Sequence, residues 1–300
     1  MTLPNFLVIG AAKAGTTSLY HYLGQHPEVF MSPVKEPHFF ALGGTGANFR
    51  SPGAEAGINR KSFADPEGYE GLFAGARGEK AIGEASTSYL YSPEAPERIK
   101  RRVPEARLIA VLRDPAERAY STFLALRLGG REPLRDFSRA LEAEEGRIRD
   151  GWEHLWHYKN LGFYHVQLSR YGKALEDGRL RVYLYEDLGA DPRGVMRDAY
   201  RFLGVDASFE PDTSQRHNMS GVSNNGFLVS LVRKRHPVKT AIKPLVPATV
   251  RRRLVSGLQK RVLSRPPFPP EVRRELVEAY REDVLRLEDL IGRDLSAWLR

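Results

Sequence analysis

Four short runs of apolar residues stand out along the chain, and each has the length of a β-strand. They are Phe6–Gly10, Ala81–Ser86, Arg107–Arg113 and Arg181–Tyr185. Short continuous apolar runs of this kind are typical of strands that are covered on both faces. The pattern therefore predicts a buried sheet.

Helical patterns fill the segments between these runs. The predicted helices are Thr16–Gln25, Pro93–Arg102, Pro115–Leu128, Phe163–Asp177, Asp191–Leu203 and Pro270–Ile291. Asp191 is placed as an N-cap with Pro192 at the first helical position, and residues 43–57, rich in Gly and Ala, predict a loop. Strands that alternate with helices predict an α/β fold in which helices flank both faces of a central parallel sheet.

Composition limits the classes of protein to consider. A chain of 300 residues, 41% of them hydrophobic, can form one large folded domain. The absence of Cys excludes disulfides, thiolate metal sites and cysteine nucleophiles. No run approaches the roughly 18 apolar residues of a membrane-spanning helix, and Met1–Gly10 lacks the basic region of a signal peptide. We therefore expect a single cytoplasmic domain over residues 1–300.

Positive charge is concentrated in one segment. The chain has 46 Lys and Arg against 37 Asp and Glu, a net charge of +9, yet residues 213–270 contain no acidic residue and 12 basic ones. Such a segment indicates an anionic partner, for example a phosphorylated or sulfated ligand, a polyanion or a membrane surface. Prolines interrupt it, and we expect a lid or acceptor-binding region, with peripheral membrane contact through residues 233–265 as an alternative.

The first candidate binding motif directly follows the first predicted strand. Gly10 begins a tight turn that leads into a helix, and Lys13 lies inside this turn. Backbone N–H groups at a helix N-terminus attract anions, and glycines allow close approach. We expect a phosphate group to be held by Lys13, Ala14, Gly15, Thr16, Thr17 and Ser18. The alternative is a glycine-rich turn with a surface lysine.

This motif departs from the loop of nucleoside triphosphatases, G-x-x-x-x-G-K-[ST]. In that loop the lysine follows the second glycine, whereas here Thr16 occupies that place. The Lys and Thr pair that holds a γ-phosphate and Mg²⁺ is therefore not reproduced. The loop favours a diester-like phosphoryl group and predicts that no metal is required.

A second candidate motif lies at the end of the third predicted strand. Arg113 ends this strand, and Ser121 follows on the next predicted helix. Ligands of open α/β sheets bind at the carboxyl ends of the strands, so we expect Arg113 beside the first motif. Arginine binds phosphate oxygens bidentately, and a serine hydroxyl can complete the shell. The alternative pairs Arg113 with Asp114 or Glu117.

The two motifs together resemble those of sulfotransferases that use 3′-phosphoadenosine 5′-phosphosulfate (PAPS). Gly10–Leu19 resembles the family's 5′-phosphosulfate loop, and Arg113–Ser121 resembles its 3′-phosphate motif. Other similar segments cover most of the chain: Gly162–Tyr171, Glu186–Leu188, Arg201–Val205 and Leu287–Trp298. The resemblance implies a single α/β domain related to the P-loop nucleotide kinases, PAPS as donor, and 3′-phosphoadenosine 5′-phosphate (PAP) as product. It also implies Arg113 and Ser121 as the pair that binds the 3′-phosphate.

The resemblance also implies a catalytic base. In glycan-type sulfotransferases a catalytic glutamate occupies the position that resembles Glu36, so we assign Glu36 as general base and His38 as its orienter or as an alternate base. Pro37 favours an extended backbone at Glu36, which would direct both side chains to one side. Lys13 would neutralise charge on the leaving phosphate. The alternative is a solvated loop in which Glu36 pairs with Lys35.

Three further segments concern the acceptor and the donor lid. Residues 83–89 resemble a Gly-Glu-Lys-[ST]-Pro segment of the family, but Ala85 replaces its lysine, which argues against an acidic polysaccharide acceptor. The aromatic and histidine residues of 152–158 are expected to wall an acceptor pocket or fill the core rather than bind a metal. Arg216 lies where the family has a mobile loop over PAPS; a contact with the 3′-phosphate and an ordinary surface loop are both open.

We therefore predict transfer of a sulfuryl group from PAPS to a hydroxyl, or less readily an amine, of a carbohydrate, lipid or small metabolite. One alternative is an ATP-dependent small-molecule kinase; the displaced Lys13 argues against it, as does Asp114, which is better interpreted as a helix cap. Another is a non-catalytic polyanion binder that uses the basic segment. A nucleic-acid partner is not expected, because that segment lacks interleaved aromatics. The acceptor and the oligomeric state stay open.

Overall fold

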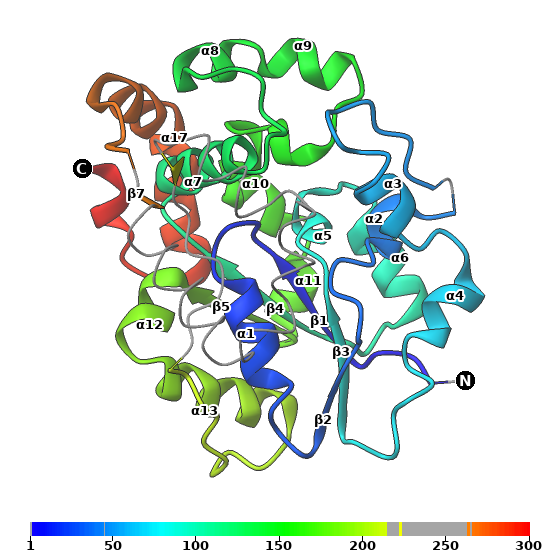
Figure 1. Cartoon of the computed structure of the whole chain (residues 1–300). Helices are drawn as coiled ribbons and strands as arrows, with labels where there is room; N and C mark the ends of the chain where they lie inside the picture. The colour runs from blue at the N-terminus through cyan, green and yellow to red at the C-terminus, as the bar shows by residue number, and fades with distance from the viewer. Residues whose placement is uncertain (1, 45, 215–221, 224–262, 265) are drawn as a thin grey trace, which may run out of the picture.

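Five parallel strands form the central sheet of the computed structural model (Figure 1). In chain order they are β1 (Phe6–Gly10), β2 (Val29–Met31), β3 (Ala81–Ala85), β4 (Arg107–Leu112) and β5 (Leu180–Leu184). Their order across the sheet is β2-β3-β1-β4-β5, and every neighbouring pair is parallel. Every residue of the central strand β1 is buried. The predicted α/β fold with a parallel sheet is therefore confirmed.

The structure describes residues 2–44, 46–214, 222–223, 263–264 and 266–300. Within the basic segment it describes only the ends and a two-stranded antiparallel ladder of β6 (Val222–Ser223) and β7 (Leu263–Ser264). The predictions for Arg216 and for nearly all of residues 233–265 lie outside the described residues.

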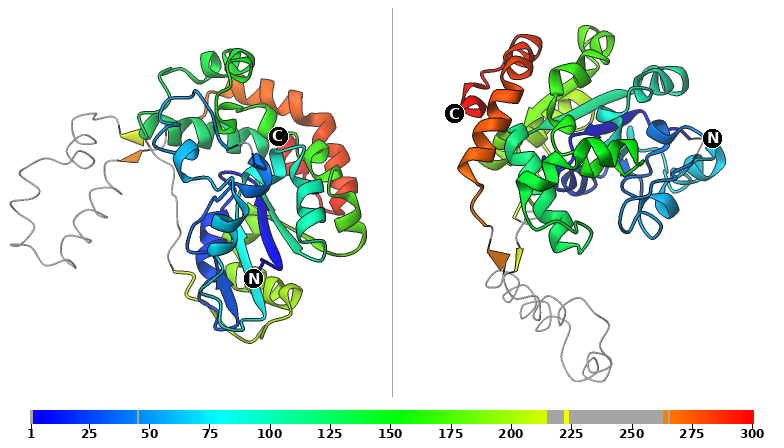
Figure 2. Two further views of the ribbon diagram at one scale, coloured as in Figure 1. Left: turned by 90° about the vertical axis from the view of Figure 1, so that its right-hand side faces the viewer. Right: turned by 90° about the horizontal axis from the view of Figure 1, so that it is seen from above.

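Helices cover both faces of the sheet (Figures 1 and 2). Helices α1 and α13 pack against each other on one face, and α6 and α11 lie on the other. The α-helices are α1 (Thr16–Leu23), α2 (Phe39–Leu42), α3 (Ile58–Lys61), α4 (Pro66–Gly71), α5 (Ser88–Tyr91), α6 (Ala95–Arg102), α7 (Pro115–Leu128), α8 (Phe137–Glu142), α9 (Glu144–Arg149), α10 (Tyr164–Ser169), α11 (Gly172–Glu176), α12 (Tyr185–Ala190), α13 (Pro192–Leu203) and α17 (Pro270–Ile291). The 3₁₀ helices are η1 (His154–Trp156), η2 (Asn160–Gly162) and η3 (Ser296–Leu299).

One predicted helix is wrong. Residues 163–177 were expected to form a continuous helix, but the structure divides them into α10 and α11. The break falls at Tyr171, whose ring is buried and whose hydroxyl donates a hydrogen bond to the carbonyl of Tyr89 at 2.8 Å. Anchoring of this side chain in the core turns the chain between the two short helices. By contrast, Asp191 caps α13 as predicted, through the N–H of Gly194.

The C-terminal helix α17 lies against α7 and α10 (Figure 2). Its buried apolar side chains belong to the same cluster as the strands. Tyr280 illustrates the close fit, because its ring lies 2.6 Å from where a Cβ on Gly162 would stand and its hydroxyl donates to the carbonyl of Lys159. Within the described part of the chain, no helix combines the length and the apolar character needed to cross a bilayer.

Candidate active site

The chain segments that follow the five strands meet at one edge of the sheet (Figure 1). Each segment contributes one residue of the candidate site, namely Lys13 after β1, Glu36 after β2, Thr87 after β3, Arg113 after β4 and Tyr185, the first residue of α12, after β5. In parallel α/β sheets this edge is where ligands bind. Residues far apart in the sequence are therefore neighbours here.

The loop after β1 places Lys13 in a partly buried, electropositive environment. Lys13 itself has a positive φ of 66°, and Gly15, which precedes α1, has a φ of 94°. A side chain at position 15 would also stand 3.2 Å from the ring of Tyr185. Burial, Arg113 and Lys35 all lower the pKa of Lys13. Clustered cations of this kind suit an anionic group.

Arg113 lies beside this loop, as the sequence predicted. Its Nη1 donates to the carbonyl of Lys13 at 3.4 Å, and its guanidinium stacks 4.7 Å from the ring centroid of Tyr185. The alternative pairing with Glu117 is also present, at 3.3 Å. These contacts hold the guanidinium against the loop. It is therefore a second cation, next to Lys13, for a polyanionic ligand.

Helix α7 carries the remaining residue of the predicted 3′-phosphate motif. Ser121 lies in the second turn of α7, and its side chain is buried. Asp114 is not a partner of Arg113, because it caps α7 through the N–H groups of Ala116 and Glu117 and pairs with Arg273 at 3.2 Å. The predicted helix cap is confirmed, whereas the nucleotide contact of Ser121 stays a prediction.

The backbone conformation predicted for Glu36 is wrong. Pro37 favours an extended residue before it, yet Glu36 has a φ of 63° in the left-handed region. Contacts with the end of β3 and the loop after it outweigh this preference. The N–H of Glu36 donates to the carbonyl of Ala85, and its carboxylate accepts from the N–H of Thr87, both at 2.8 Å. The carboxylate also pairs with Lys35 at 2.5 Å, so the alternative pairing exists within the site.

His38 nevertheless lies next to Glu36. Its Nδ1 is 3.8 Å from the Glu36 carboxylate and 2.7 Å from the hydroxyl of Ser88. The backbone N–H of His38 donates to the hydroxyl of Ser86 at 3.0 Å. His38 too has a positive φ, 58°. The two predicted residues are therefore brought together by strained backbone that the loop after β3 holds in place.

Charge and burial give these two groups different protonation states. Burial alone would raise the pKa of Glu36, but Lys35, His38 and Thr87 together lower it to about 2. Burial lowers the pKa of His38 to about 4, against the opposing effect of Glu36. At neutral pH the site therefore presents a carboxylate beside a neutral imidazole.

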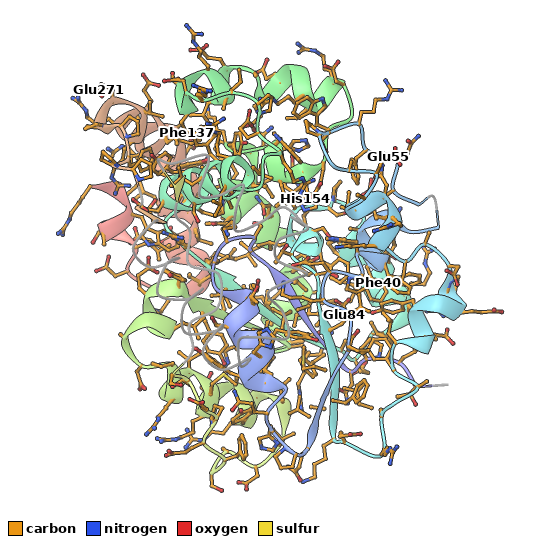
Figure 3. All side chains as sticks on the ribbon, in the orientation of Figure 1. Phe40, Glu55, Glu84, Phe137, His154 and Glu271 are labelled. Atoms are coloured by element: carbon orange, nitrogen blue, oxygen red, sulfur yellow. The ribbon has the colours of Figure 1, made fainter. Side chains whose placement is uncertain are left out.

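A second carboxylate lies beneath the site. Glu84 is fully buried near the end of β3, whereas Glu271 lies at the periphery (Figure 3). Glu84 accepts hydrogen bonds from the hydroxyls of Ser86 at 2.9 Å and Tyr69 at 3.3 Å. Burial raises its pKa to about 7. Because Ser86 also binds the His38 backbone, Glu84 supports the loop that carries the candidate base.

Sequence reasoning missed Thr87 and Tyr185. Tyr185 directly follows β5, and Thr87 is the second residue after β3. The rule that ligands bind at strand ends, which placed Arg113, therefore also applies to them. Thr87 gave no signal by type, since its place resembles a proline position of the family motif. Within the described ranges, no group of three or more acidic or histidine side chains is arranged to hold a metal ion.

Comparisons with known proteins identify the family of this chain. The model described as "Sulfotransferase family" matches residues 4–211. The chain is 28% identical, over 99% of its length, to bifunctional heparan sulfate N-deacetylase/N-sulfotransferase 4 of Mus musculus, and covers 31% of that protein. It is also 28% identical, over 68% of its length, to carbohydrate sulfotransferase 15 of Homo sapiens, and covers 44% of it. The chain thus spans less than half the length of either relative.

Solved structures show the same fold. A sulfotransferase from Alicyclobacillus acidocaldarius is 36% identical, with a TM-score of 0.80 and full coverage of both chains. Mouse sulfotransferase SULT7A1, solved with PAP, shares the fold at 14% identity, with a TM-score of 0.52 and coverage of 96% of this chain and 86% of that one. Since the family match covers more than half of the chain, this protein belongs to the sulfotransferase family.

Proposed function

We propose that the protein transfers a sulfuryl group from PAPS to a hydroxyl of an acceptor. The observation that carries this proposal is that Lys13 and Arg113 lie next to each other at one edge of the sheet. Glu36 belongs to the same group, because Lys35 pairs with its carboxylate and also acts on Lys13. Two separate cations suit a nucleotide with a phosphate at each end. Glu36 supplies the carboxylate that proton removal from a hydroxyl requires.

In this mechanism the acceptor oxygen forms a bond to sulfur while the bond between sulfur and the 5′-phosphate oxygen breaks. The hydroxyl proton passes to the Glu36 carboxylate, and the electron pair of the broken bond stays on the phosphate. Lys13 neutralises the charge that develops there. Positioning and electrostatics supply most of the rate enhancement, as in phosphoryl transfer.

The low pKa of Glu36 belongs to the protein without donor. Lys35, which is 2.5 Å from the carboxylate, also acts on Lys13. An anionic phosphosulfate bound near Lys13 therefore attracts Lys35 as well and raises the pKa of Glu36, because nearby negative charge disfavours a carboxylate. Donor binding thus makes Glu36 a stronger base at the stage where a base is needed. His38, neutral and hydrogen-bonded to Ser88, orients it.

The geometry disfavours a kinase. Strand β4 is followed by Arg113, and Asp114 is engaged in the α7 cap and with Arg273. That carboxylate is therefore committed to structure rather than available to hold Mg²⁺. Lys13 precedes Gly15 instead of following it, so the loop differs from that of nucleoside triphosphatases.

Isothermal titration calorimetry with PAP and AMP tests the proposal. AMP lacks the 3′-phosphate, and we expect it to bind about tenfold or more weakly, because charge-assisted hydrogen bonds contribute about 1.5–3 kcal/mol. Arg113→Ala should reduce PAP affinity to the level of AMP, whereas Arg135→Ala, an exposed arginine on a loop, should not. Equal affinity of the unmodified protein for both nucleotides, or binding of neither, would contradict the proposal.

A further inference from the structure

A small cavity lies directly beside His38. Its volume is about 170 Å³, and it is a half-open pocket bordered by α2, α5 and the η1 segment. Its apolar wall consists of Ala41, Leu42, Phe49, Ile58 and Pro93. For comparison, an engineered apolar cavity of about 150 Å³ holds a benzene molecule. The cavity is therefore the size of one small ring.

Several polar side chains at this cavity are hydrogen-bonded to other groups of the protein. His38 Nδ1 is engaged with Ser88, and the hydroxyl of Tyr91 lies 2.9 Å from His157 Nδ1. The other nitrogen of His157 is 3.2 Å from the carbonyl of Trp152. These pairs reduce the polar surface that faces the cavity, whose wall also contains His154 and Ser92, the latter bonded to Glu94.

The cavity also lacks charge. Burial lowers the pKa of His38 and of His157 to about 4, and it lowers the pKa of His154 as well. All three imidazoles are neutral at pH 7, and none of the described residues that line the cavity is Lys, Arg, Asp or Glu. An anionic or strongly hydrated group would lose its solvation here without a partner.

We propose that this cavity receives the apolar ring of the acceptor, so that the acceptor is an alcohol or phenol whose hydroxyl is carried by a ring of about the size of benzene. His38 forms the common wall, because it borders the cavity and lies 3.8 Å from the Glu36 carboxylate. A ring seated beside His38 brings its hydroxyl toward the base. This inference rests on the proposed sulfuryl transfer and specifies its acceptor.

A second cavity provides the contrast. It measures about 570 Å³, lies between α2 and α6, and is bordered by Arg98, Arg101 and Arg102. Ala64 lines this larger cavity as Ala41 lines the smaller one, and both alanines are half-buried. The pair allows a matched experiment, since the same substitution can fill either cavity. An acidic saccharide acceptor would prefer the arginine-bordered cavity.

Binding of phenol and cyclohexanol tests the proposal without requiring turnover. The full chain is titrated calorimetrically in the presence of saturating PAP, if it binds PAP. Both probes should bind the unmodified protein. Ala41→Phe should weaken them about tenfold or more, since lost space in an apolar pocket costs at least that much. Ala64→Phe should leave their affinity unchanged. No binding of either probe, or equal loss in both variants, would overturn the proposal.

Turnover provides a second readout that does not depend on Ala41→Phe folding correctly. Phe49→Ala enlarges the cavity, so the ratio of kcat/KM for 2-naphthol to that for phenol, with PAPS as donor, should rise about tenfold. An unchanged ratio, or a preference for an acidic saccharide, would refute the ring site. Failure of PAP itself to bind would instead refute the sulfotransferase proposal, so the two failures are distinguishable.

Discussion

At the scale of single residues, the site depends on how burial and charge compete at each carboxylate. Glu36 remains ionised because Lys35 and Thr87 outweigh the effect of burial. The described partners of Glu84 are hydroxyl groups instead, and burial raises its pKa to about 7. Two carboxylates at neighbouring strand ends therefore have opposite properties. Glu36 is ionised at neutral pH, whereas Glu84 titrates near neutral pH and supports a loop.

Replacing Glu36 by Gln should separate binding from chemistry. The amide retains an acceptor for Thr87 but cannot remove a proton, so we expect unchanged PAP affinity and a fall in kcat of about 10²- to 10⁴-fold. Calorimetry and a sulfuryl-transfer assay measure the two effects. Glu97→Gln, an exposed change on α6, serves as the control. Near-normal turnover of Glu36→Gln would remove Glu36 as the base.

Glu84 should make stability depend on pH. Its pKa is about 7 in the folded protein against 4.5 ordinarily, so folding favours the protonated form. The stabilisation is fully present below the unfolded value and is lost as pH rises through about 7. Glu84→Gln removes this titration. Urea unfolding from about pH 5 to 8 should show a steeper loss of stability in the unmodified protein than in the variant. Parallel curves would show that Glu84 is not the titrating group.

At the scale of elements, the start of α7 joins the candidate nucleotide site to the C-terminal helix. Asp114 caps α7 and also binds Arg273 of α17, while the preceding residue, Arg113, reaches the loop after β1. The first turn of α7 therefore fixes the direction in which Arg113 leaves the sheet.

Two substitutions of Asp114 should distinguish its two roles. Asp114→Ala loses the cap and the ion pair, so we expect a loss of about 1–2 kcal/mol in the free energy of unfolding. Asp114→Asn retains an oxygen for the N–H groups of α7 and should lose less than half of that amount. Urea unfolding at neutral pH gives both values. Equal losses would mean that Arg273, rather than capping, accounts for the effect.

At the scale of the whole molecule, the C-terminal helix is part of the core although it lies outside the matched residues 4–211. Buried Tyr280, Val284 and Leu287 of α17 contact the same cluster as the strands. Asp283 adds hydrogen bonds from the N–H groups of His165 and Val166 at the start of α10. We therefore predict one cooperative folding unit.

Gly162→Ala tests that prediction. A Cβ at this position would stand 2.6 Å from the Tyr280 ring, so we expect overpacking to cost about 1–3 kcal/mol. Gly172→Ala is the matched control, because a Cβ there would meet no described residue within 4 Å outside its own helix turn. Calorimetry should show a single transition that moves to lower temperature only in Gly162→Ala. A separate early transition would mean that α17 unfolds on its own.

The sequence by itself determined four of the five strands, with β2 missed, the α/β class and the place of two candidate motifs at strand ends. These follow from local rules, because apolar runs, caps such as Asp114 and the glycine turn around Lys13 act over a few residues. The rule that ligands meet strand ends then placed Arg113 next to Lys13, which the structure confirms.

Only the tertiary structure decided the rest. Glu36 adopts a left-handed backbone because Ala85 and Thr87, about fifty residues later in the chain, bind it there. The helix predicted over residues 163–177 is divided because Tyr171 is anchored to Tyr89. The shifted pKa values and the cavity beside His38 likewise arise from packing between distant segments. Such effects depend on which side chains pack together in the folded protein, and the local sequence pattern does not contain that information.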